Sequence, residues 1–107
     1  MTKTIDISNF ETEVSAAHLP IMADFYAEWC GPCAESAKMV NDIEKKTEGK
    51  MKVIRVDVDE NAEICEKYCI KSVPTFIFFS DGEIQKQLTG CMDEEVFESE
   101  VDDFLGL

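Results

Sequence analysis

The chain has 107 residues, the length of a single domain over residues 1–107, and can bury a hydrophobic core without a metal or a disulfide to hold it together. Hydrophobic residues make up 45% of it, which argues against disorder, and its longest apolar run, residues 75–79, is too short to cross a bilayer. A formal net charge of −13 repels nucleic acid and anionic lipid, so we expect protein partners, no nucleic acid and no membrane.

The N-terminal ten residues, MTKTIDISNF, contain no apolar stretch of signal-peptide length. We therefore expect a cytoplasmic location, where thiols are kept reduced. In that compartment the five cysteines of the chain are not expected to form structural bridges.

Strand and helix patterns alternate along the first half of the chain. We predict strands over residues 3–7 and 21–27 and helices over residues 8–17 and 32–48. The first helix begins with the capping-box spacing SNFE, and the second strand is an apolar run without helical period, as expected for a strand buried on both faces. In the second helix Ala37, Val40 and Ile43 are predicted to face the core, and Gly49 is the stop signal.

The second half of the chain adds three strands and two helices. Strands are predicted over residues 51–58, up to residue 79 and over 84–89, and helices over 60–68 and after residue 93. Asp59 and Asp93 are the expected N-caps, and the sequence SDGE predicts a hairpin turn between the last two strands. The terminal helix has apolar residues at helical spacing: Val96, Phe97, Val101, Phe104 and Leu105. The order βαβαβαββα describes an α/β fold with a mixed sheet of about five strands and four helices on its two faces.

The CxxC pair Cys30 and Cys33 lies where the second strand gives way to the second helix. The unsatisfied N–H groups and the macrodipole at a helix N-terminus stabilise a thiolate, so Cys30 is predicted to be the nucleophile. Cys33, one helical turn further on, can attack a mixed disulfide formed at Cys30 and close an intramolecular disulfide. The spacing therefore predicts a carrier of two electrons.

The residues around the two thiols suit this role. Gly31 allows a tight turn, and Pro32 fits the first turn of a helix because its missing N–H is not needed there. Trp29 offers an amphipathic surface to a partner chain.

Other interpretations of the cysteines are less well supported. A closed zinc site needs four ligands, and the remaining soft candidates have spacings that fit no common metal motif: His18, Cys65, Cys69 and Cys91. A structural bridge from Cys30 to Cys33 would close too short a loop to restrict the unfolded chain much. His18, between a helix and a strand, is read as a surface residue rather than a catalytic base.

The motif WCGPC at 29–33, preceded by Asp24-Phe25 and followed by Val73-Pro74-Thr75, resembles the thioredoxin family over essentially the whole chain. The resemblance implies the thioredoxin fold and protein disulfide reductase activity, with no cofactor besides the Cys30–Cys33 disulfide. It also implies disulfide-containing substrate proteins and a thioredoxin reductase, of the flavin and NADPH type or the ferredoxin type, as partners. We expect a monomer.

The resemblance also assigns positions around the thiols. It implies that Pro74 is a cis proline facing the CxxC pair, that Val73 offers its backbone to an extended substrate, and that Asp24 lies buried behind Cys33. It places the docking surface on Trp29, Gly31, Pro32, Val73, Pro74, Gly90 and Cys91. The chain departs from the common family pattern at Ala34, Lys38, Arg55 and Tyr26. These departures bear on the local pKa values rather than on the reaction.

Asp24 lies between Ala23 and Phe25 in an apolar strand, where a carboxylate is costly to ionise. Its pKa is therefore expected above the usual value, which would let it accept the proton of Cys33 during resolution.

The other three cysteines leave alternatives open. Cys91 is interpreted as a small apolar contact residue, with a regulatory thiol open to glutathionylation as the alternative. Cys65 and Cys69 are four apart, a spacing that strains a disulfide on an intact helix, so separate thiols are favoured. A second redox pair stays open, because Cys69 stands at a helix-ending position that often takes left-handed backbone angles.

Two functions from different classes fit the sequence. The first is a disulfide reductase that turns over, and the second is a non-catalytic binding or assembly subunit with the same fold. The presence of both CxxC cysteines together with Asp24 and Val73-Pro74 favours the reductase.

Overall fold

The computed structural model of the chain describes residues 3–5, 10, 14 and 18–107. The expected first helix, residues 8–17, lies outside the described residues except for Phe10 and Val14, which are both buried. The last two residues of the expected first strand, 6 and 7, are likewise outside the described residues.

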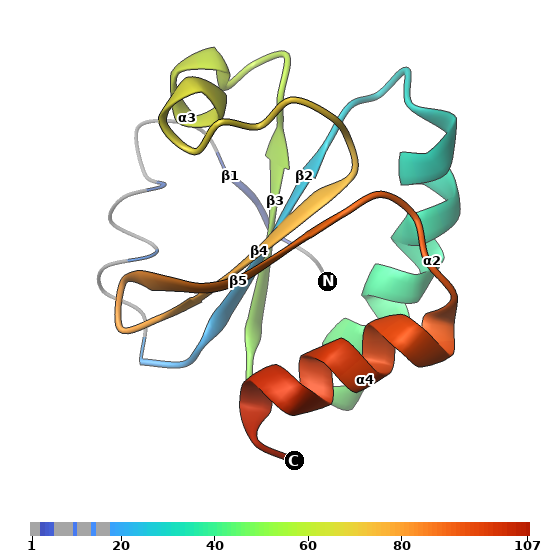
Figure 1. The fold of residues 1–107 in the computed structure, drawn as a ribbon, viewed down its shortest axis with the longest axis vertical. Helices are drawn as coiled ribbons and strands as arrows, with labels where there is room; N and C mark the ends of the chain where they lie inside the picture. The colour runs from blue at the N-terminus through green and yellow to red at the C-terminus, as the bar shows by residue number, and fades with distance from the viewer. Residues whose placement is uncertain (1–2, 6–9, 11–13, 15–17) are drawn as a thin grey trace.

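The described strands form one mixed sheet, which confirms the predicted sheet (Figure 1). The strands are β1 (Lys3–Ile5), β2 (Ile21–Tyr26), β3 (Lys52–Asp57), β4 (Thr75–Ser80) and β5 (Glu83–Thr89), in the spatial order β1-β3-β2-β4-β5. β3 runs parallel to both β1 and β2, whereas β4 is antiparallel to β2 and β5 is antiparallel to β4. Strand β2 therefore lies at the centre of the sheet, where its six residues are all buried.

The described helices lie on both faces of the sheet, as predicted (Figure 1). They are α2 (Gly31–Lys46), α3 (Ala62–Lys67) and α4 (Glu94–Leu105). Successive side chains of a strand point to opposite faces, and β2 follows this rule. Met22 packs in one core cluster with residues of α2 and α4, and Phe25 packs in the other with Ile64 of α3. Asp24 and Tyr26 share the face of Met22, so they point toward the side that α2 covers.

The hairpin between β4 and β5 forms where the sequence predicted it. Asp81 and Gly82 both have positive φ, 53° and 80°, which is the backbone geometry that a two-residue type I′ turn requires. In the part of the chain that the structure describes, no helix is long and apolar enough to span a bilayer.

Several predicted details are wrong. Asn61, not Asp59, is the N-cap of α3, and the carboxylate of Asp59 accepts a hydrogen bond from the indole of Trp29. Helix α2 ends at Lys46 rather than at residue 48, since Thr47 closes it with backbone and hydroxyl hydrogen bonds to the Ile43 carbonyl. Val96 is exposed, whereas Phe97 and Val101 are buried and Phe104 and Leu105 pack against the same cluster.

Candidate active site

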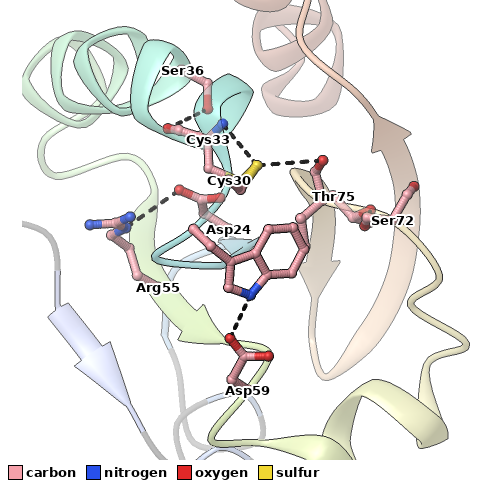
Figure 2. The surroundings of a disulfide bond; sticks show 10 residues. Asp24, Cys30, Cys33, Ser36, Arg55, Asp59, Ser72 and Thr75 are labelled. Atoms are coloured by element: carbon pink, nitrogen blue, oxygen red, sulfur yellow. Dashed lines mark hydrogen bonds and ion pairs between the residues drawn. A yellow bond between two sulfur atoms is a disulfide. The ribbon is translucent and has the colours of Figure 1, made fainter.

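The two CxxC cysteines form a disulfide at the first turn of α2 (Figure 2). Cys30 is the N-cap of the helix in an extended conformation, and its Sγ accepts a hydrogen bond of 3.1 Å from the Cys33 N–H. No acidic residue occupies the first turn of α2. The sulfur of Cys30 therefore receives one of the free N–H groups of the helix and the positive end of its dipole.

Both sulfur-bearing residues are nearly buried, Cys30 at 6% and Cys33 at 4% exposure. They form a small cluster with Tyr26 and Ala27 at the end of β2, and Val58 and Val73 pack against it. Trp29, just before Cys30, is exposed, and so are Gly31 and Pro32, which lie between the two cysteines. These three residues form an exposed rim across which a partner can approach the disulfide.

The loop before β4 lies directly against the disulfide. The Val73 carbonyl oxygen is 3.8 Å from the Sγ of Cys30, and the Val73–Pro74 peptide bond is cis. The Gly90 N–H donates a hydrogen bond of 2.8 Å to the Pro74 carbonyl, so the end of β5 is tied to this loop. Gly90 has φ of 90°, which glycine adopts without strain. Residues far apart in sequence thus meet at the sulfur atoms.

Trp29 is 71% exposed yet fixed in orientation. Its indole N–H donates a hydrogen bond of 2.8 Å to the carboxylate of Asp59, as Figure 2 shows. A groove of about 510 Å³ runs from Trp29 and Val73 toward α3, with Val58, Cys65 and Ile70 along it. No local pattern predicts the contact with Asp59, because the position of that residue before α3 is equally typical of a helix cap.

Asp24 is 2% exposed, in the face of β2 that α2 covers. Burial raises its pKa from 3.8 to about 6, although the nearby Arg55 guanidinium acts in the opposite direction. The Nε of Arg55 lies 3.6 Å from Oδ2, and Figure 2 shows the two side chains pointing toward one another. Among the described residues, the other oxygen, Oδ1, has no protein hydrogen-bond partner. The expected burial and raised pKa of Asp24 are both present.

The remaining cysteines are free thiols. Cys91 is exposed and borders a hollow of about 310 Å³ between the first half of α2 and the start of α4, next to Ser36 and Met92. Cys65 is half-buried with its Sγ 3.9 Å from the Val58 carbonyl oxygen, whereas Cys69 is exposed with φ of 56°. The predicted left-handed backbone at Cys69 is confirmed.

Neither a metal-binding cluster nor a second hollow extends this site in the part of the chain that the structure describes. The described residues include no group of three His, Cys, Asp or Glu side chains placed to hold a metal ion. His18 is exposed. A hollow of about 560 Å³ lies at the opposite end of α2, beside Lys45 and Met51, and contains none of the predicted site residues.

Comparison with known proteins identifies the family to which this geometry belongs. The family model described as Thioredoxin matches residues 1–103. A thioredoxin of Rickettsia felis is 41% identical over 83 residues, covering 78% of this chain and 79% of the relative. A thioredoxin of Synechocystis is 33% identical over 104 residues, 97% of each chain, and Thioredoxin 1 of Nostoc is 39% identical over 85 residues, 79% of each. With its CxxC disulfide at the start of α2, the chain belongs to the thioredoxin family and is a protein disulfide oxidoreductase.

Proposed function

We propose that the chain reduces disulfides of substrate proteins with Cys30 as the attacking thiolate and Cys33 as the resolving thiol. The Cys30 thiolate attacks one sulfur of a substrate disulfide, which breaks and releases one substrate thiolate. Cys33 then attacks the Sγ of Cys30, releases the second substrate thiol and leaves the Cys30–Cys33 disulfide. The observation that carries this assignment is the N-cap position of Cys30, whose sulfur accepts the Cys33 N–H.

Asp24 is proposed to accept the proton of Cys33 during the second step. Its pKa of about 6 makes it mainly ionised at neutral pH, while its burial keeps it a stronger base than an exposed carboxylate. Its position in β2, on the face that α2 covers, supports this role.

Substrate docking is proposed to use the exposed rim and the loop beside the disulfide. The proposed docking surface consists of the exposed Trp29, Gly31, Pro32 and Cys91, the half-buried Val73 and Gly90, and the buried Pro74 between them and the sheet. The Val73 backbone lies beside the Sγ of Cys30, which supports its pairing with an extended substrate segment. Cys91 is proposed to contribute as a small contact residue, without a redox role.

The two electrons are proposed to come from a reductase, of the flavin and NADPH type or the ferredoxin type, with no further cofactor. We propose that the chain works as a monomeric single domain over residues 1–107 in the cytoplasm. Five cysteines, three of them free, favour such a reducing location.

An insulin-reduction assay driven by dithiothreitol tests the proposal. The wild type is expected to accelerate precipitation of the insulin B chain, and the double variant Cys30→Ser/Cys33→Ser is expected to give only the background rate. Cys69→Ser is the matched control, since it removes an exposed free cysteine that belongs neither to the disulfide nor to the lining of the groove beside Trp29. Equal rates for the wild type and the double variant would instead favour a binding or assembly subunit.

A further inference from the structure

Two departures from the common family pattern, Tyr26 and Arg55, meet at Asp24. Asp24 and Tyr26 are two apart on β2, so their side chains leave the same face of the sheet. Arg55 is the register partner of Asp24 on the parallel strand β3. The sheet therefore places a ring, a guanidinium and a carboxylate side by side.

The guanidinium of Arg55 contacts both neighbours. Its Cζ lies 3.8 Å from the centroid of the Tyr26 ring, and its Nε lies 3.6 Å from Oδ2 of Asp24. A distance of 3.6 Å is too long for a hydrogen bond, so the ion pair alone does not fix the geometry of the guanidinium. The Arg55 side chain is 27% exposed, so its guanidinium can also turn toward solvent and be hydrated there. Stacking on the Tyr26 ring favours the conformation in which the guanidinium stays beside Asp24.

The Tyr26 ring is itself held firmly. Tyr26 is only 9% exposed and packs in the same cluster as Cys30 and Cys33. It therefore joins the wall of the disulfide to the cation beside Asp24.

We propose that Tyr26 is a positioning residue whose ring holds the Arg55 guanidinium against the Asp24 carboxylate. A cation held there favours the ionised carboxylate and offsets part of the cost of burying it. Tyr26 thereby keeps Asp24 ionised at a lower pH than burial alone would allow.

Few other charges face Asp24. Its partner on β4 is the apolar Phe76, and the cysteines of α2 are joined in an uncharged disulfide. On β3 the next side chain of the same face is Asp57, whose carboxylate accepts the Asp59 N–H at 2.9 Å and lies in register with Tyr26 rather than with Asp24. In the described part of the chain, Arg55 is thus the cation paired with Asp24.

The experiment measures the pKa of Asp24 directly, from the pH dependence of its side-chain carboxyl ¹³C shift in the oxidised protein. The variants are Tyr26→Leu, which removes the ring, Tyr26→Phe, which keeps it, and Arg55→Met, which removes the cation. Arg55→Met is expected to raise the pKa of Asp24 by about one unit and Tyr26→Leu by roughly half to one unit, whereas Tyr26→Phe should leave it near the wild-type value. Tyr26→Met replaces Tyr26→Leu if the latter does not fold.

A double-mutant cycle separates positioning from general packing. If the ring acts through Arg55, Tyr26→Leu should add no further rise in the Arg55→Met background. A Tyr26→Leu protein that is folded and keeps the wild-type pKa of Asp24 would overturn the proposal, and so would an equal rise in both backgrounds.

The expected effect on the rate of resolution rests on the proposed role of Asp24 as proton acceptor. The expected shift in the pKa of Asp24 does not depend on that role. A rise of about one unit lowers the ionised fraction of Asp24 at pH 6 about fivefold, so resolution should slow by about that factor there and less at pH 8. A shifted titration with unchanged resolution kinetics would remove Asp24 from the proposed mechanism while leaving the positioning by Tyr26 intact. The insulin assay tests the cysteines independently of both.

Discussion

The chain carries two cysteine pairs on helices, and they lie at opposite helix ends. Cys30 and Cys33 stand at the N-terminus of α2, three apart, and are joined in a disulfide. Cys65 lies in the last turn of α3 and Cys69 lies just beyond the C-cap Tyr68, four residues apart, and both are free. The same side chain thus meets opposite electrostatic surroundings in one small protein.

At the start of α2 the sulfur of Cys30 receives a backbone N–H, which favours a thiolate. At the end of α3 the backbone presents carbonyl groups, and the pKa of Cys65 is raised by burial and by the nearby carboxylates of Asp59 and Asp57. A thiolate is therefore stabilised at Cys30 and disfavoured at Cys65.

The backbone also separates the second pair. The Ile70 N–H bonds to the Cys65 carbonyl and the Cys69 N–H bonds to the Glu66 carbonyl, which is the Schellman pattern of helix ends. Cys65 and Ile70 pack against the same core, whereas Cys69 points into solvent. The two pairs therefore differ in helix polarity and in the direction of their side chains as well as in spacing.

Replacement of the α2 cysteines should have the largest effect. Cys33→Ser is expected to accumulate mixed disulfides with substrate, because Cys30 can still attack but nothing resolves the product. Cys30→Ser should form none, since the remaining thiol lacks the N-cap position. Non-reducing gels and mass spectrometry of each variant after incubation with oxidised insulin provide the measurement.

Cys69→Ser serves as the control for this pair of variants, and its mixed-disulfide content should match that of the wild type. Trapping of insulin by Cys30→Ser as efficiently as by Cys33→Ser would show that the roles of the two α2 cysteines are reversed or shared.

Neutralising Asp24 should have the next largest effect, on stability. A folded-state pKa of about 6 against 3.8 means that folding favours the protonated carboxyl. The contribution of this carboxyl to the free energy of unfolding is fully present below pH 3.8 and is lost as the pH rises through about 6. The difference between the two limits is about 3 kcal/mol. Asp24→Asn should therefore unfold at higher denaturant than the oxidised wild type at pH 7.5, by up to about 3 kcal/mol, and show little gain at pH 3.5.

Asp81→Asn, at the exposed hairpin turn, is the matched control and should follow the pH dependence of the wild type. Relative to the wild type, the same Asp24→Asn protein should be slowed more in the resolution of mixed disulfides than in the initial attack. A stability gain that is equal at both pH values would contradict the buried, titrating carboxyl.

The sequence predicted what local patterns encode. WCGPC located the thiols at a helix start, SDGE located the hairpin, and an apolar strand indicated that Asp24 would be buried. These features depend on a few neighbouring residues, so periodicity and turn chemistry are sufficient.

The sequence did not predict contacts between distant residues. Local sequence predicts a helix cap at Asp59, but the folded chain brings this residue to Trp29. Arg55 and Tyr26 stack only because β2 and β3 pair in parallel at one particular register, which no local pattern specifies. The sequence therefore predicted the cysteine pair that forms the disulfide, whereas the side chains that surround it required the folded structure.

The smallest expected effect concerns the α3 pair and tests the comparison most directly. In the oxidised native protein, Cys69 should react with iodoacetamide faster than Cys65 by roughly tenfold or more, because Cys65 is half-buried and its raised pKa leaves less thiolate. Cys30 and Cys33 should react only after reduction, since their sulfurs are joined. Timed alkylation followed by peptide mapping measures all four sites in one sample.

Air oxidation should leave free thiols at Cys65 and Cys69, because the helix end directs one side chain into the core and the other into solvent. A peptide linking Cys65 to Cys69 would show that this helix end opens far enough to form a second redox pair.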